Sequence, residues 1–265
     1  MSATTTTERF LTTKDGCLYV KKWVPYSAHI NAKSPIVLFH DSLGCVELWR
    51  DFPERLAMLT SREVIAYDRI GFGRSDPYPG TLDYDFVFKE ARTGFAEVIN
   101  QLDLQGFVCF GHSVGGGMAV VSAATYPEQC IGLITESAQS FVEDRTLEGI
   151  REAKHAFSNS GQLDRLRKYH GHKAEWVLQA WIDTWLSDQF RNWTLREVLP
   201  DVKCPVLAIH GSDDEYGSTA HPSMITELAA GPTSMEIIPN CGHVPHKEDM
   251  PRVLESVSGF MEGAM

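Results

Sequence analysis

Short apolar runs recur along the chain and give the first indication of its fold. The first two, residues 10–13 and 17–24, are separated by the turn-forming residues 14–16 and predict an antiparallel β-hairpin. Most of the later runs are separated by stretches long enough for a helix, which is typical of a mainly parallel sheet. These later runs are residues 36–39, 64–67, 107–110, 131–135, 206–209 and 235–238.

Two of the intervening stretches have the pattern of helices. Residues 86–102 carry apolar side chains at helical spacing, and residues 114–126 are rich in small apolar side chains and end before Pro127. Eight strands with such connections predict an α/β fold, in which a mainly parallel eight-stranded sheet has helices on both faces.

The alternation of strands and helices breaks between Ile134 and Pro205. This stretch has helical patterns and no convincing strand, so we expect an inserted helical cap over residues 139–198 and a core domain formed by residues 1–138 and 199–265. Four tryptophans fall in the cap, and they either pack its helices on the core or line a pocket; we expect the second role for Trp181 and Trp185. The four are Trp176, Trp181, Trp185 and Trp193.

The charge balance excludes several partners. The chain has 35 acidic and 24 basic residues, and the resulting net charge of −11 repels nucleic acid and anionic lipid. The six cysteines include no CxxC pair and predict neither a zinc site nor a disulfide scaffold. No run of 18 apolar residues and no N-terminal leader pattern occurs, so we expect a cytoplasmic protein without a membrane partner. The expected partner is a small-molecule substrate, and the sequence leaves open whether the chain forms a homo-oligomer.

A GxSxG pentapeptide at residues 111–115 follows an apolar strand and opens a probable helix. Glycines two before and two after a serine allow a strained turn that projects the hydroxyl, here that of Ser113. The start of the helix then offers N–H groups to a developing oxyanion. A glycine-rich helix packed on the sheet would also use these glycines, but the residues that follow favour catalysis.

A serine nucleophile needs a base, and His243 is the candidate because its loop follows the last strand and Gly242 precedes it. We expect His246, three residues later, at the surface or in a supporting position. His112 is a candidate for the pocket floor, and His40 and His210 stand at strand ends. No pair of histidines has metal-ligand spacing with an acidic third residue, so no metal or other cofactor is predicted.

The histidine in turn needs an acid that fixes its tautomer. Asp214 follows the penultimate strand, three residues after Gly211, and gives the order serine, acid, histidine. Three rivals stay open: Glu136 at the end of the sixth apolar run, and the two neighbours of Asp214. These neighbours are Asp213 and Glu215.

Two backbone amides are expected to form an oxyanion hole. One is that of Val114, directly after the nucleophile, and the other lies in the loop after the run at 36–39. There Ser42 is our choice and Leu43 the alternative; Leu43 is also a candidate for the pocket wall.

Taken together, these segments resemble the α/β-hydrolase superfamily over nearly the whole chain. Residues 67–76 (YDRIGFGRSD) look like its loop after strand 4, 111–115 like its nucleophile elbow, 204–214 like its acid strand and 242–243 like its histidine loop. Within it, the chain is similar to capped, cofactor-independent hydrolases. Dehalogenases and epoxide hydrolases of this superfamily have aspartate at the nucleophile position, where this chain has Ser113.

This resemblance and the residues themselves predict a serine hydrolase that cleaves a small carboxylic ester, thioester or lactone. Two alternatives stay open: a carbon–carbon bond hydrolase of ring-fission products, and a receptor that keeps the fold without turnover. The first is usually marked by asparagine before the serine and tryptophan after the histidine, where this chain has His112 and Val244. It also needs a cation for a substrate carboxylate, and the cap offers Arg145, Arg165, Arg167 and Arg191.

Overall fold

The computed structural model describes residues 4–26, 33–158 and 161–264. Residues 1–3 of the N-terminal stretch and residues 159–160 of the predicted cap therefore lie outside the described part. The described chain contains an eight-stranded sheet in the order β1-β2-β4-β3-β5-β6-β7-β8. The strands are β1 (Thr4–Thr13), β2 (Gly16–Pro25), β3 (Ile36–Phe39), β4 (Val64–Tyr67), β5 (Phe107–His112), β6 (Cys130–Glu136), β7 (Val206–Gly211) and β8 (Thr233–Ile238).

The pairing of the strands confirms the predicted fold class. β1 and β2 form the antiparallel hairpin, β2 runs antiparallel to β4, and every later neighbour is parallel. The parallel strands β3 to β7 are buried on both faces, which explains why they read as continuous apolar runs. Their carboxyl ends meet at one edge of the sheet, the edge that carries sites in open α/β folds.

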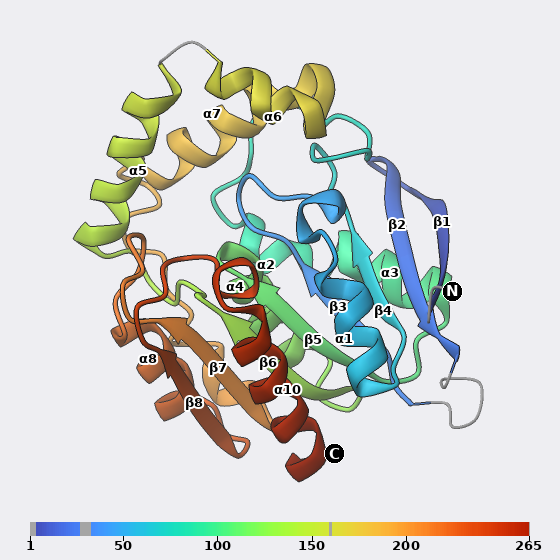
Figure 1. Ribbon diagram of the computed structural model, residues 1–265. Helices are drawn as coiled ribbons and strands as arrows, with labels where there is room; N and C mark the ends of the chain where they lie inside the picture. The colour runs from blue at the N-terminus through green and yellow to red at the C-terminus, as the bar shows by residue number, and fades with distance from the viewer. Residues whose placement is uncertain (1–3, 27–32, 159–160, 265) are drawn as a thin grey trace.

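Helices cover both faces of this sheet (Figure 1). α1 and α10 pack on one face, while α2, α3, α4 and α8 pack on the other. Their bounds are α1 (Phe52–Thr60), α2 (Phe86–Glu90), α3 (Gly94–Leu102), α4 (Val114–Thr125), α8 (Ala220–Leu228) and α10 (Met250–Ala264), with the short α9 (Pro245–Glu248) before α10. None of the described helices is long and apolar enough to cross a membrane.

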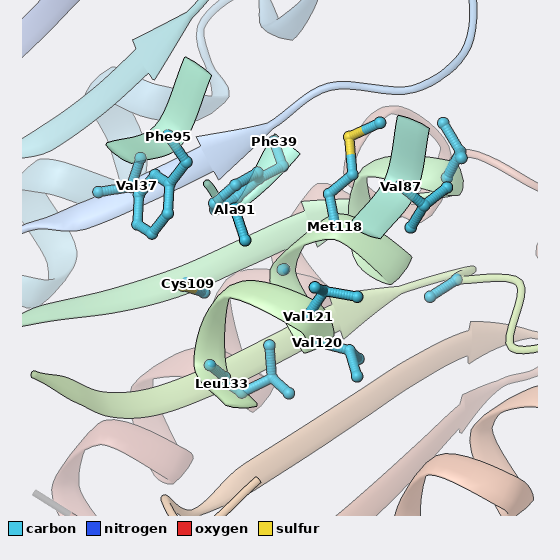
Figure 2. Packing of buried hydrophobic residues seen from close by; sticks show 14 of the residues in the cluster. Val37, Phe39, Val87, Ala91, Phe95, Cys109, Met118, Val120, Val121 and Leu133 are labelled. Atoms are coloured by element: carbon cyan, nitrogen blue, oxygen red, sulfur yellow. The ribbon is translucent and has the colours of Figure 1, made fainter. Parts of the chain in front are cut away.

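The core beneath α4 is continuous across three strands. Figure 2 shows Met118, Val120 and Val121 of α4 above side chains of β3, β5 and β6. These residues are at most 3% exposed, and their packing fixes the start of α4 relative to the end of β5. The point between β5 and α4 is where the sequence places the nucleophile.

The prediction of a single helix over residues 86–102 is wrong. The structure has two helices, α2 and α3, with a turn at residues 91–93. Glu90 at the break turns inward, where its carboxylate accepts a hydrogen bond of 2.8 Å from the Tyr67 hydroxyl. A Cβ at position 94 would lie 2.4 Å from Oε1 of Glu90, so the next helix starts on Gly94. The spacing of apolar residues alone does not predict this polar contact.

Helices also fill most of the stretch between β6 and β7. α5 (Asp144–Phe157), α6 (Gln162–His170) and α7 (Ala174–Trp185) lie beyond the carboxyl ends of the strands (Figure 1). Short 3-10 turns, η3 (Gly171–Lys173) and η4 (Leu199–Asp201), complete the segment. The domain boundaries at 138/139 and 198/199 remain a prediction.

Candidate active site

Ser113 occupies a strained turn between β5 and α4. Its backbone angles, φ 57° and ψ −128°, are rare for a residue with a side chain. The flanking glycines are required by close packing: a Cβ at Gly111 would lie 2.2 Å from the carbonyl oxygen of Gly115, and one at Gly115 would lie 2.2 Å from that of Phe39. The pattern that predicted the turn therefore has a steric cause.

The serine meets a histidine and an aspartate from two other strand ends. Nε2 of His243 is 3.0 Å from Oγ of Ser113, and Nδ1 of His243 is 2.9 Å from both carboxylate oxygens of Asp214. Asp214 is fully buried. Burial alone would raise the pKa of its carboxyl, but the hydrogen bond with His243 and the charges of His243 and His210 hold that pKa below its usual value. An ionised Asp214 keeps the proton of His243 on Nδ1, which leaves Nε2 free to accept.

The rival acids occupy other positions. Glu136 is fully buried but pairs with His246 instead of His243. Asp213 accepts a hydrogen bond from the Ser212 hydroxyl, and Glu215 accepts one of 3.2 Å from the backbone N–H of His243. The imidazole of His243 therefore faces Asp214 alone among the four candidates.

The two residues predicted to form the oxyanion hole lie close to the serine. Val114 is the first residue of α4, so its N–H has no acceptor within the helix. Ser42, in the loop after β3, lines the same pocket as Ser113. The alternative Leu43 also lines the pocket, but its N–H already donates to Oδ1 of Asp41 at 2.8 Å. The geometry therefore favours Ser42 over Leu43 as the second donor.

A pocket of about 140 Å³ opens directly over the serine. Its walls combine apolar side chains from α5 and α7 with polar groups at the strand ends. Trp181 and Trp185 line it, whereas Trp176 packs against Phe72 and Tyr78, and Trp193 against Phe190. The lining residues are Asp41, Ser42, Leu43, His112, Ser113, Gln139, Thr146, Ile150, Trp181, Trp185, Tyr216, His243 and Val244.

Two polar residues at the serine were not foreseen from the sequence. The Ser113 hydroxyl lies 3.2 Å from Oε1 of Gln139, and the Asp41 carboxylate lines the same pocket. Both follow the carboxyl ends of predicted parallel strands, β6 and β3, and that position was the available signal.

Several other histidines are buried, among them His40, His170, His210, His221 and His246. His246 was expected at the surface or in a supporting position; at 2% exposed it is not at the surface, and the supporting role stays a prediction. Its ring packs against Trp49 and Phe52, and its Nδ1 donates to Glu136. Trp49 belongs to the 3-10 helix η2 (Val46–Trp49).

One group of potential metal ligands occurs among the described residues. Atoms of His112, Glu136 and His246 come within 4.8 Å of one another, and all three residues are buried. Nδ1 of His246 already hydrogen-bonds to Glu136, and Nε2 of His112 to the carbonyl oxygen of His243. The cluster is a hydrogen-bonded network, and we assign no ion to it.

Comparisons with known proteins find hydrolases among the relatives of this chain. The human serine hydrolase BPHL is 27% identical over 221 residues, which cover 80% of this chain and 73% of that protein. The bifunctional esterase/perhydrolase DCH of Acinetobacter calcoaceticus is 26% identical over 236 residues, covering 78% of this chain and 82% of that protein.

Solved structures and a family model extend the likeness. The proline iminopeptidase of Mycobacterium smegmatis superposes with a TM-score of 0.72 at 18% identity, over 97% of this chain and 98% of that one, which shows the shared fold. The model of the alpha/beta hydrolase family matches residues 36–256. Because that match spans most of the sequence, the chain belongs to the α/β hydrolase family.

Proposed function

We propose that this protein is a serine hydrolase that cleaves a small carboxylic ester, thioester or lactone through an acyl-Ser113 intermediate. The observation that carries the proposal is the unbroken contact from Asp214 through His243 to the Ser113 hydroxyl, with distances of 2.9 and 3.0 Å, at the floor of a pocket. The relatives named as a serine hydrolase and an esterase support the same reaction class.

The reaction follows from these positions in two steps. His243 takes the proton of Ser113 as Oγ bonds to the substrate carbonyl carbon, and the amides of Ser42 and Val114 stabilise the oxyanion. His243 then gives this proton to the departing alkoxide or thiolate. Water, deprotonated by His243, attacks the acyl carbon and releases the acid and free serine. These steps need no metal or cofactor.

The size and charge of the pocket support a small substrate without a carboxylate. A volume of about 140 Å³ lies below the range of about 300–1,000 Å³ that is common for ligand pockets. No arginine or lysine occurs among the described residues that line it, and Asp41 adds a carboxylate. The four cap arginines lie outside this lining and are exposed. A ring-fission product carries a carboxylate, which would meet no arginine or lysine side chain in this lining.

Parallel turnover measurements test the proposal. We expect kcat/KM for p-nitrophenyl acetate, p-nitrophenyl butyrate or a short-chain thioester to exceed that for a ring-fission dienoate at least tenfold, which is about 1.4 kcal/mol in transition-state binding. Ser113→Ala should lower the ester rate by about 10³-fold or more. A dienoate consumed tenfold faster than every ester would assign carbon–carbon cleavage instead, and binding of a ligand without any turnover would assign a receptor.

A further inference from the structure

His112, the residue before the nucleophile, contacts both the loop after β3 and the loop after β8. Its Nε2 lies 2.8 Å from the backbone carbonyl oxygen of His243, in the loop after β8. Its Nδ1 lies 3.3 Å from Oδ2 of Asp41, in the loop after β3. The ring is 2% exposed, so no solvent replaces either partner.

Both groups that face the ring nitrogens of His112 are acceptors. A carbonyl oxygen only accepts, so Nε2 carries a proton. Nδ1 has no aligned hydrogen-bond partner, but it lies 3.3 Å from Oδ2 of Asp41. A protonated Nδ1 makes this contact an ion pair, whereas a bare Nδ1 would place two electron-rich atoms side by side, so both contacts are favourable when the ring is an imidazolium.

The surroundings of His112 favour this positive charge. Facing it are Asp41 from the loop after β3, Glu136 from β6, His243 and His246 from the segment after β8, and the ring of Trp49 from η2. Lys247 acts from farther away, on Asp41. Burial by itself lowers the pKa of His112, but Asp41, Glu136 and the carbonyl of His243 outweigh burial and raise that pKa above its usual value.

Each end of this connection holds a group that the proposed reaction uses. Oδ1 of Asp41 accepts the N–H of Leu43, in the turn that contains Ser42. At the other end, the carbonyl of His243 belongs to the residue proposed to accept the serine proton. One ring thus contacts both the loop of the candidate oxyanion donor and the loop of the candidate base.

We propose that His112 is a positioning residue which, as an imidazolium, ties the oxyanion loop at Ser42 to the histidine loop at His243. This inference rests on the proposed function for its kinetic consequence, whereas the protonation state is argued from the two acceptor groups and the carboxylates around the ring. Loss of the Nδ1 proton at alkaline pH would turn the contact with Asp41 from attractive to repulsive and loosen the oxyanion loop.

Nitrogen NMR of the imidazole tests the charge without any assay of activity. In the wild-type protein at pH 7 we expect both ring nitrogens of His112 to have the chemical shifts of protonated nitrogens, with the signal assigned by its loss in His112→Asn. In Asp41→Asn, which keeps the Leu43 contact but removes the carboxylate, the titration midpoint of His112 should move to lower pH. A single protonated nitrogen at pH 7, or an unchanged midpoint in Asp41→Asn, would overturn the proposal.

The pH profile tests the positioning role. Wild-type kcat should fall at alkaline pH, while His112→Asn should show a kcat about 10- to 100-fold lower at pH 7, a KM within about threefold and no alkaline fall. The control is His221→Gln, which alters a buried histidine paired with Glu143 outside both loops and should keep the alkaline fall. An alkaline fall that persists in His112→Asn contradicts the proposal. If the wild type turns over no ester, the proposed function fails, and the NMR result still decides the charge of His112.

Discussion

Two histidines that lie three residues apart in the sequence each pair with a buried carboxylate, and the two pairs differ in what surrounds them. His243 pairs with Asp214 and turns its other nitrogen to Ser113 and the pocket. His246 pairs with Glu136, through both its backbone N–H and its Nδ1, but its ring lies among aromatic side chains. The same residue types therefore make a candidate catalytic pair at the pocket and a structural pair in the core.

The comparison shows that pairing alone does not identify a catalytic histidine. Both carboxylates are fully buried and both imidazoles carry a carboxylate on Nδ1. What distinguishes His243 is the free Nε2 within 3.0 Å of a hydroxyl. Variants should therefore affect rate at the first pair and stability at the second.

The largest expected difference is between the two acids. In Asp214→Asn, the amides of Tyr216 and Gly217 hold the remaining oxygen at the Oδ1 position, so the new NH2 group faces Nδ1 of His243. His243 then takes the tautomer with a proton on Nε2 and cannot accept the serine proton, and kcat should fall by about 10⁴-fold. Glu136→Gln should change kcat by no more than about tenfold. Steady-state kcat values on one ester compare the two variants. A larger loss of kcat in Glu136→Gln than in Asp214→Asn would assign the catalytic acid to Glu136 on β6.

The second pair should appear in stability instead. His246→Ala leaves the buried carboxylate of Glu136 without its partner, and the free energy of unfolding should fall by about 3–5 kcal/mol. Adding Glu136→Gln should recover part of this loss, because the unpaired buried carboxylate is then removed. Denaturant unfolding measures both variants. The control is Arg55→Gln, which breaks an exposed pair with Asp51 and should cost under about 1 kcal/mol. A loss for His246→Ala no larger than the control would contradict the structural role.

The smallest effect concerns the remaining buried histidines. Burial lowers the pKa of His40, His170, His210 and His221 below its usual value. Below pH 6.5 the unfolded chain binds protons at these residues that the folded chain does not, so stability falls with falling pH until the folded pKa is reached. Each histidine contributes up to about 1.4 kcal/mol per pH unit in that window.

Unfolding at a series of pH values from 7.5 to 5 measures this slope. We expect it to exceed the value for a single proton in the wild type and to decrease in His221→Gln. A free energy of unfolding that stays constant over this range would show that the buried histidines are protonated in the folded protein as readily as in the unfolded chain.

Much of this fold follows from local sequence. Short apolar runs predicted all eight strands. The five strands β3 to β7 are parallel and buried on both faces, which requires continuous apolar side chains. Ser113, Asp214 and His243 were predicted from the glycines and strand ends near them, and the structure brings the three together.

The features that sequence reasoning missed depend on contacts between distant segments. The break between α2 and α3 coincides with a hydrogen bond that the Tyr67 hydroxyl donates to Glu90, 23 residues away. The burial of His246 depends on Glu136, 110 residues away. Local periodicity does not predict such pairs, because they form only when the fold brings distant segments together.

The most direct test of the account is the site of covalent labelling by a fluorophosphonate, an acyl-transfer mimic that reacts with an activated serine. The account predicts one adduct per chain, mapped by peptide mass spectrometry to Ser113, with labelling strongly slowed in His243→Ala and nearly unchanged in His246→Asn once its folding is verified. An adduct on another residue of an active protein, or labelling that survives His243→Ala at the wild-type rate, would contradict it.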